Sequence, residues 1–94
     1  MSTGWLVGVM VEVRDAAEPV RHFFAVGHAE QAKAEWTAID SAALIGPVAM
    51  SPVGGIEPVQ ALGEIPAARM KSLGLAPGQV RGLGWKWPRR WLPG

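Results

Sequence analysis

Apolar and polar positions alternate near the start of the chain in the manner of a β-strand. Every odd position from 5 to 13 is tryptophan or valine, while the even positions become charged at Glu12. β-Branched residues with one wholly apolar face are typical of an antiparallel strand. Val20–Val26 (VRHFFAV) is predicted to be a second strand, and residues 15–19 (DAAEP) supply turn chemistry. The pattern therefore predicts a β-hairpin over residues 5–26 with a loop of about five residues.

The next stretch has the spacing of an amphipathic helix. Its apolar stripe consists of residues spaced alternately three and four positions apart, namely Ala29, Ala32, Trp36, Ile39 and Ala43. His28 stands at the N-cap position, and Gly46 followed by Pro47 ends the pattern. We expect a helix over residues 29–44 that buries this stripe against the sheet.

Residues 46–58 form a stretch with three prolines and three glycines in thirteen positions. A segment of this length and composition is typical of a functional or mobile loop, so we expect a mobile loop that contains edge strands at most. Residues 66–73 then predict a short helix with proline in its first turn. Gly74 is expected to be the left-handed residue after that helix, with Leu75 folded back onto Met70.

A last strand is predicted over residues 79–87. Trp85 and Trp87 occupy alternate positions in it, so both indoles are expected on one face, where they would pack in the core. Pro88 lacks the N–H group that a sheet ladder requires. We therefore expect residues 88–94 to leave the sheet as an exposed tail.

These elements predict one α+β domain over residues 1–94. Its N-terminal hairpin packs on the amphipathic helix, and a short helix and a C-terminal strand follow, in the order β-β-α-(β)-α-β within an antiparallel or mixed sheet. The expected core consists of Trp5, Val7, Val9, Val11, Phe24, Val26, Ala32, Trp36, Ile39, Met70, Leu73, Leu83 and Trp85.

Composition narrows the class of protein. The 94 residues contain no cysteine, which excludes a disulfide framework and a thiolate metal site. Hydrophobic residues make up 49% of the chain and charged residues 18%, as in a folded domain rather than a disordered one. No apolar run approaches the ~20 residues of a transmembrane helix, and the start MSTGW lacks signal-peptide features. A cytoplasmic protein without peripheral membrane contact is expected.

The net charge of +1 hides an uneven distribution. Residues 1–64 carry all eight acidic and three basic side chains, a net −5, whereas residues 65–94 carry six basic side chains and no acid, a net +6. Such asymmetry indicates either an anionic partner for the basic part or contact between the two parts. We favour contact between the two parts, within the fold or across a dimer, because opposite charges commonly lie close together on protein surfaces.

No catalytic, cofactor-binding or metal-binding signature is present. The only histidines, His22 and His28, lack the spacing of metal ligands, and the glycines fit neither a dinucleotide-binding nor a phosphate-binding loop. The acidic residues around the hairpin loop are expected to be solvated rather than paired for acid–base chemistry. We therefore expect no enzyme and no cofactor.

A binding role is left, with two candidate forms. The first is a protein–protein interaction or self-associating module. The two faces of the first strand present more apolar surface than one short helix can cover, so a homo-oligomer or protein partner is expected. The alternative is a module that binds nucleic acid or another polyanion through its basic, tryptophan-rich C-terminal third. The candidate anion-binding or partner-binding residues are Lys86, Arg89, Arg90 and Trp91.

One short stretch resembles a known family. Residues 73–80 (LGLAPGQV) are similar to the helix end, turn and strand of FeoA-type SH3-like domains. The hairpin and helix that precede this stretch do not follow the pattern of that barrel, so the resemblance implies no function for the chain.

Overall fold

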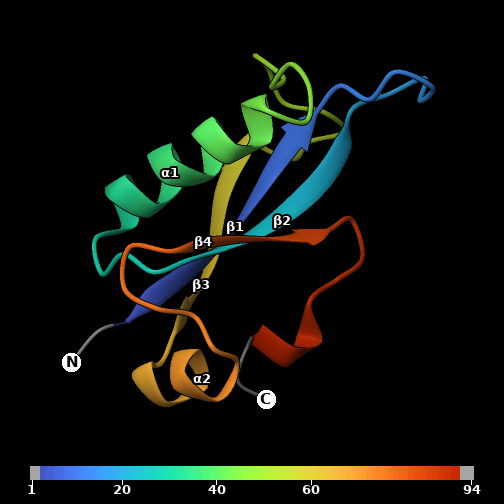
Figure 1. Ribbon diagram of the computed structural model, residues 1–94. Helices are drawn as coiled ribbons and strands as arrows, with labels where there is room; N and C mark the ends of the chain where they lie inside the picture. The colour runs from blue at the N-terminus through green and yellow to red at the C-terminus, as the bar shows by residue number, and fades with distance from the viewer. Residues whose placement is uncertain (1–2, 92–94) are drawn as a thin grey trace.

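The computed structural model describes residues 3–91 and places four strands and two helices in the predicted order (Figure 1). The elements are β1 Gly4–Val11, β2 Val20–Val26, α1 Gln31–Ala43, β3 Val59–Ile65, α2 Ala67–Ser72, β4 Val80–Gly84 and a final 3-10 turn η1 Arg89–Trp91. The strands form one sheet in the order β3-β1-β2-β4, in which every pair is antiparallel. The predicted α+β class is confirmed. None of the helices within residues 3–91 is long and apolar enough to cross a membrane.

The hairpin of β1 and β2 forms as predicted but has a longer loop. Its ladder runs from Trp5 opposite Val26 to Val11 opposite Val20, so the loop comprises residues 12–19 rather than 15–19. Pro19, the next residue toward the loop, has no N–H to extend the ladder. The N–H of Glu12 instead donates to the carbonyl oxygen of Pro47 at 2.8 Å, which turns the end of β1 toward the chain after α1.

The sheet carries a separate hydrophobic core on each face. Beneath α1 lie Val7, Val9, Val11, Phe24, Val26, Ala34, Ala38 and Ala42. On the opposite face lie Leu6, Phe23, Ala25, Ile65, Met70, Leu75 and Trp91. In Figure 1, α1 lies along the strands in the upper part of the picture. Helix α2 and the red C-terminal turn lie near each other in the lower part. Both faces of β1 and both phenylalanines are thus covered within the chain, which removes the argument that they require a partner.

Helix α1 presents a different face to the sheet than the sequence pattern predicts. Its buried residues are Ala34, Ala38 and Ala42, each four positions from the next. Ala32 and Trp36 were expected in the core, yet both are exposed, and Trp36 retains 68% of its accessible surface. Small alanine side chains let the helix approach the valines of β1 closely, whereas an indole at that interface would hold it away.

The start of α1 also differs from the expected one. The helix begins at Gln31, and Glu30 rather than His28 is the N-cap residue. The indole Nε1 of Trp5 donates to the carbonyl oxygen of Ala29 at 3.0 Å, which ties the chain before the helix to the sheet. Helix α1 begins two residues after this contact, at Gln31.

Residues 46–58 are linked to the end of β1 by backbone hydrogen bonds. Val48 forms an isolated antiparallel bridge with Val11, and the N–H of Met10 donates to the carbonyl oxygen of Pro58 at 2.8 Å. A second bridge joins Val53 to Ile56 across a two-glycine turn. Both are isolated bridges, so the expectation that this stretch contains edge strands at most is confirmed, while its mobility stays a prediction.

The end of helix α2 follows the predicted cap. Gly74 has a φ of 75°, and the N–H of Leu75 donates to the carbonyl oxygen of Met70 at 2.8 Å. Leu75 and Met70 are both buried in the core opposite α1. This capping motif therefore joins α2 to the second face of the sheet.

Candidate binding surface at the C-terminal segment

The last strand ends three residues earlier than predicted. Gly84 has a φ of 79°, a left-handed conformation that diverts the chain from the sheet, so β4 stops there. Trp85 and Trp87 consequently do not project from a strand face into the core. They retain 64% and 52% of their accessible surface, which shows that the expectation of core packing for both was wrong.

Replacing Gly84 with alanine tests whether its left-handed backbone creates this turn. We expect the free energy of unfolding to fall by about 1–2 kcal/mol, because an L-residue is strained in that conformation. No atom lies within 4 Å of a Cβ at this position, so the cost is conformational. The control is Gly82→Ala, whose Cβ would meet only Phe24 at 3.9 Å. Urea denaturation should find that control unchanged or more stable by up to about 1 kcal/mol, and equal losses in the two variants would contradict the assignment.

After Gly84 the chain folds back over the second core instead of forming an exposed tail. Turn η1 places Trp91 against that core with only 7% of its surface accessible. The guanidinium carbon of Arg81 lies 5.7 Å from the centroid of the Trp91 ring, within range of a cation–π interaction. Arg81 also donates to the carbonyl oxygen of Leu73 at 2.8 Å and so links β4 to the end of α2. The expectation of an exposed tail is wrong for residue 91, and residues 92–94 lie outside the described part of the chain.

The four predicted binding residues surround one open pocket of about 290 Å³. Its lining consists of Leu83, Lys86, Trp87, Pro88, Arg89, Arg90 and Trp91. Lys86, Arg89 and Arg90 are exposed, whereas Trp91 lines the pocket from its buried position. We call the exposed set Trp85, Lys86, Trp87, Arg89 and Arg90 the C-terminal surface. Sequence reasoning identified its cations but assigned its two indoles, Trp85 and Trp87, to the core.

The cations of this surface have no acidic partner in the described chain. Within residues 3–91 the only ion pair joins Lys33 to Glu30 at 3.8 Å, at the start of α1. The expected pairing of the basic C-terminal part with the acidic part inside one molecule is therefore absent from this region. The positive charge of Lys86, Arg89 and Arg90 faces solvent, so it is available to an anionic group from outside.

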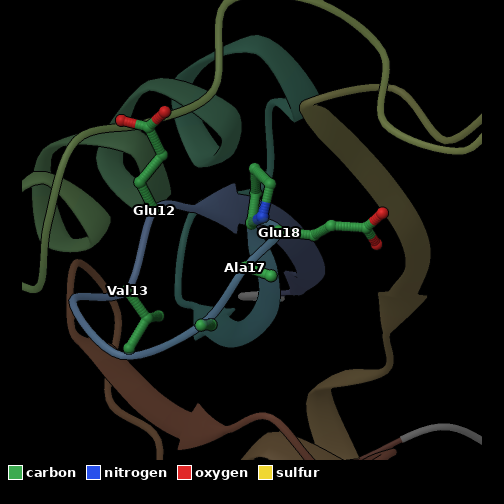
Figure 2. A pocket seen from close by; sticks show the side chains of 6 residues that line it. Glu12, Val13, Ala17 and Glu18 are labelled. Carbon is green, nitrogen blue, oxygen red and sulfur yellow. The ribbon is translucent and has the colours of Figure 1, made fainter.

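A second pocket of about 240 Å³ lies in the hairpin loop and contains two carboxylates, Glu12 and Glu18. Figure 2 shows these two side chains directed away from each other, and the loop residues between them are exposed. A shared proton or metal ion requires carboxylates that converge. Among the residues that the structure describes, no group of three or more histidine, cysteine or acidic side chains could hold a metal ion. His22 and His28 are each partly buried and belong to no such group.

No protein-family model, curated protein or solved structure matches this chain.

Proposed function

We propose that the protein is a protein-binding module that engages its partner through the C-terminal surface. The observation that supports this proposal is a pocket lined by the exposed Trp87 and by three cations without an ion-pair partner in residues 3–91, with the exposed Trp85 next to it in the chain. Tryptophan and arginine are the residue types that most often dominate the binding energy of protein interfaces. The surface offers both residue types, and about half or more of each indole stays accessible to a partner.

The exposed indoles would contribute a substantial apolar term to a contact with a partner. A tryptophan buries about 200 Å² when fully enclosed, so covering the exposed half of one indole contributes roughly 2–3 kcal/mol at about 25 cal/mol per Å². Two such indoles, Trp85 and Trp87, would offset part of the entropy lost on association. The adjacent cations would add orientation and a dependence on salt.

A peptide-display selection tests the proposal. Random peptides are selected on the immobilised wild-type chain, and the affinity of each enriched peptide is measured by fluorescence anisotropy. We expect Arg89→Ala/Arg90→Ala to weaken binding at least about tenfold, as expected when charged contacts are lost from an interface. The control variant Arg14→Ala/Lys33→Ala removes the same number of positive charges from the hairpin loop and α1 and should bind as wild type.

Two results would contradict the proposal. One is a selection that enriches no sequence, and the other is a set of peptides that bind both double variants equally well. A partner that is a second copy of the chain would cover the same surface. In that case light scattering would report a mass above that of one chain, and the mass would return to that of one chain in Arg89→Ala/Arg90→Ala.

Nucleic-acid binding is the second candidate function, favoured by the contact between Lys86 and Trp85. The Lys86 ammonium nitrogen lies 5.7 Å from the centroid of the Trp85 ring, so a cation is held next to an exposed aromatic face. Proteins that bind single strands combine stacking on aromatic rings with cations that contact phosphates. Anisotropy of a labelled oligothymidylate should then rise at low salt and fall steeply at moderate salt. An unchanged anisotropy at low salt would exclude this candidate.

A further inference from the structure

We infer that the binding surface continues from the C-terminal surface across the sheet to Arg21 and receives an extended acidic segment of a partner protein. This inference rests on the proposed function and specifies its partner. Arg21 lies in the part of the sequence that is acidic overall, so charge counting does not connect it with the basic C-terminal part. The strand arrangement in the sheet instead places Arg21 on the face that carries the basic C-terminal part.

Arg21 projects from the face of the sheet that also carries the C-terminal surface. Alternate residues of a strand share a face, so Arg21 lies on the same side of β2 as Phe23, which belongs to the core that contains Trp91. The Arg21 Nε atom lies 2.7 Å from the point that a Cβ at Gly8 would occupy. Its Nη2 donates to the side-chain oxygen of Gln60 on β3 at 2.8 Å. The side chain therefore extends across β1 toward β3 instead of pointing away from the sheet.

One aromatic ring connects Arg21 with the C-terminal surface. The guanidinium carbon of Arg21 lies 5.4 Å from the centroid of the Phe23 ring, and the Trp87 ring meets the same ring edge-on at 5.5 Å with an interplanar angle of 87°. Arg21 and the Trp87 ring are thus at most about 11 Å apart, a span that roughly three residues of an extended chain cover. The two groups can contact neighbouring side chains of a single bound segment.

The charge of Arg21 points to an acidic occupant. Within residues 3–91 its guanidinium makes one hydrogen bond, to a neutral amide, and no ion pair. Arginine presents five donors in a planar fork that matches a carboxylate, so most of its donors stay available. With the cations around the pocket, the surface has the order cation, aromatic, cation. A segment with two acidic clusters separated by apolar residues is complementary to that order.

The experiment uses two labelled synthetic peptides and measures their affinity by fluorescence anisotropy. The first peptide carries two glutamate pairs separated by three residues that include leucine, and the second has one pair replaced by glutamines. We expect Arg21→Gln to weaken binding of the first peptide about five- to tenfold and to leave the second unchanged, because only the first reaches both cationic positions. Arg21→Lys, which keeps the charge, should retain most of the affinity. Arg14→Gln, which removes an exposed arginine from the hairpin loop, should have no effect.

Several outcomes would overturn the inference, and they are distinguishable from failure of the proposed function. If Arg21→Gln binds the first peptide as wild type while Arg89→Ala/Arg90→Ala binds it weakly, the surface ends at Trp87 and the proposed function stands. If Arg21→Gln weakens both peptides equally, it acts by displacing Phe23 and Trp87, which also overturns the inference. If neither peptide binds, the occupant is not an acidic segment. If oligothymidylate alone binds and depends on Arg21, the partner is a nucleic acid. Thermal denaturation of each variant confirms that it is folded.

Discussion

Replacing Trp91 with alanine is expected to lower the free energy of unfolding by about 3–5 kcal/mol, the usual cost of removing a buried tryptophan. Its indole packs in the core opposite α1 with residues of β1 and α2, among them Leu6 and Met70. The substitution would leave a cavity there and would remove the aromatic ring under Arg81. A domain of this size has a total stability of about 5–15 kcal/mol, so the variant should be close to unfolding at physiological temperature.

Trp85→Ala is the matched control for Trp91→Ala. It removes the same side chain six positions away, where 64% of the surface is already accessible, so we expect a change within about 0.5 kcal/mol. Both variants are measured by urea denaturation followed by circular dichroism, because fluorescence changes when an indole is removed. A stable Trp91→Ala together with an unstable Trp85→Ala would show that the last strand continues beyond Gly84 and that the C-terminal turn does not pack on the sheet.

The second large effect is expected from Ala38→Leu in helix α1. Ala38 is fully buried between the helix and the valines of β1, so a larger side chain must displace the helix or strain its neighbours. Overpacking of this kind typically costs about 1–3 kcal/mol. Alanine and leucine have similar helix propensities, so the loss can be attributed to packing.

Ala32→Leu is the control on the exposed face of the same helix, and it should change stability by no more than about 0.5 kcal/mol. Thermal and urea denaturation measure both variants. A larger loss of stability in Ala32→Leu than in Ala38→Leu would indicate that the helix face with Trp36 is the buried one. That result would contradict the alanine interface. Equally small losses of stability in the two variants would mean that neither face is tightly packed, which would also contradict the alanine interface.

The elements predicted correctly from the sequence are those determined by neighbouring residues. The alternation in β1, the strand composition of β2 and the glycine cap after α2 all depend on neighbouring residues, and each element appears in the structure. The buried face of α1 could not be chosen in this way. Its alanine stripe and its tryptophan stripe fit the same helix, and the choice depends on the size of the sheet residues that it meets.

The tryptophans near the C-terminus show a similar limit. Two glycines, Gly82 and Gly84, lie in the last strand, and the sequence does not reveal that only the second has a positive φ. That one torsion angle decides which indoles face solvent and allows the chain to return and bury Trp91. The candidate cations were predictable because they are neighbours in the chain. The contribution of Arg21 depends on strand register, which a single sequence does not determine.

The segregation of charge between the two sides of the sheet also affects how fast a partner associates. The acids of α1, Glu35 and Asp40, lie with the helix on one side, while the cations of the C-terminal surface belong to the side that carries the second core. The positive electrostatic potential around Lys86, Arg89 and Arg90 therefore attracts an approaching anion before contact is made. Raising the ionic strength should consequently lower the association rate constant strongly and change the dissociation rate constant little.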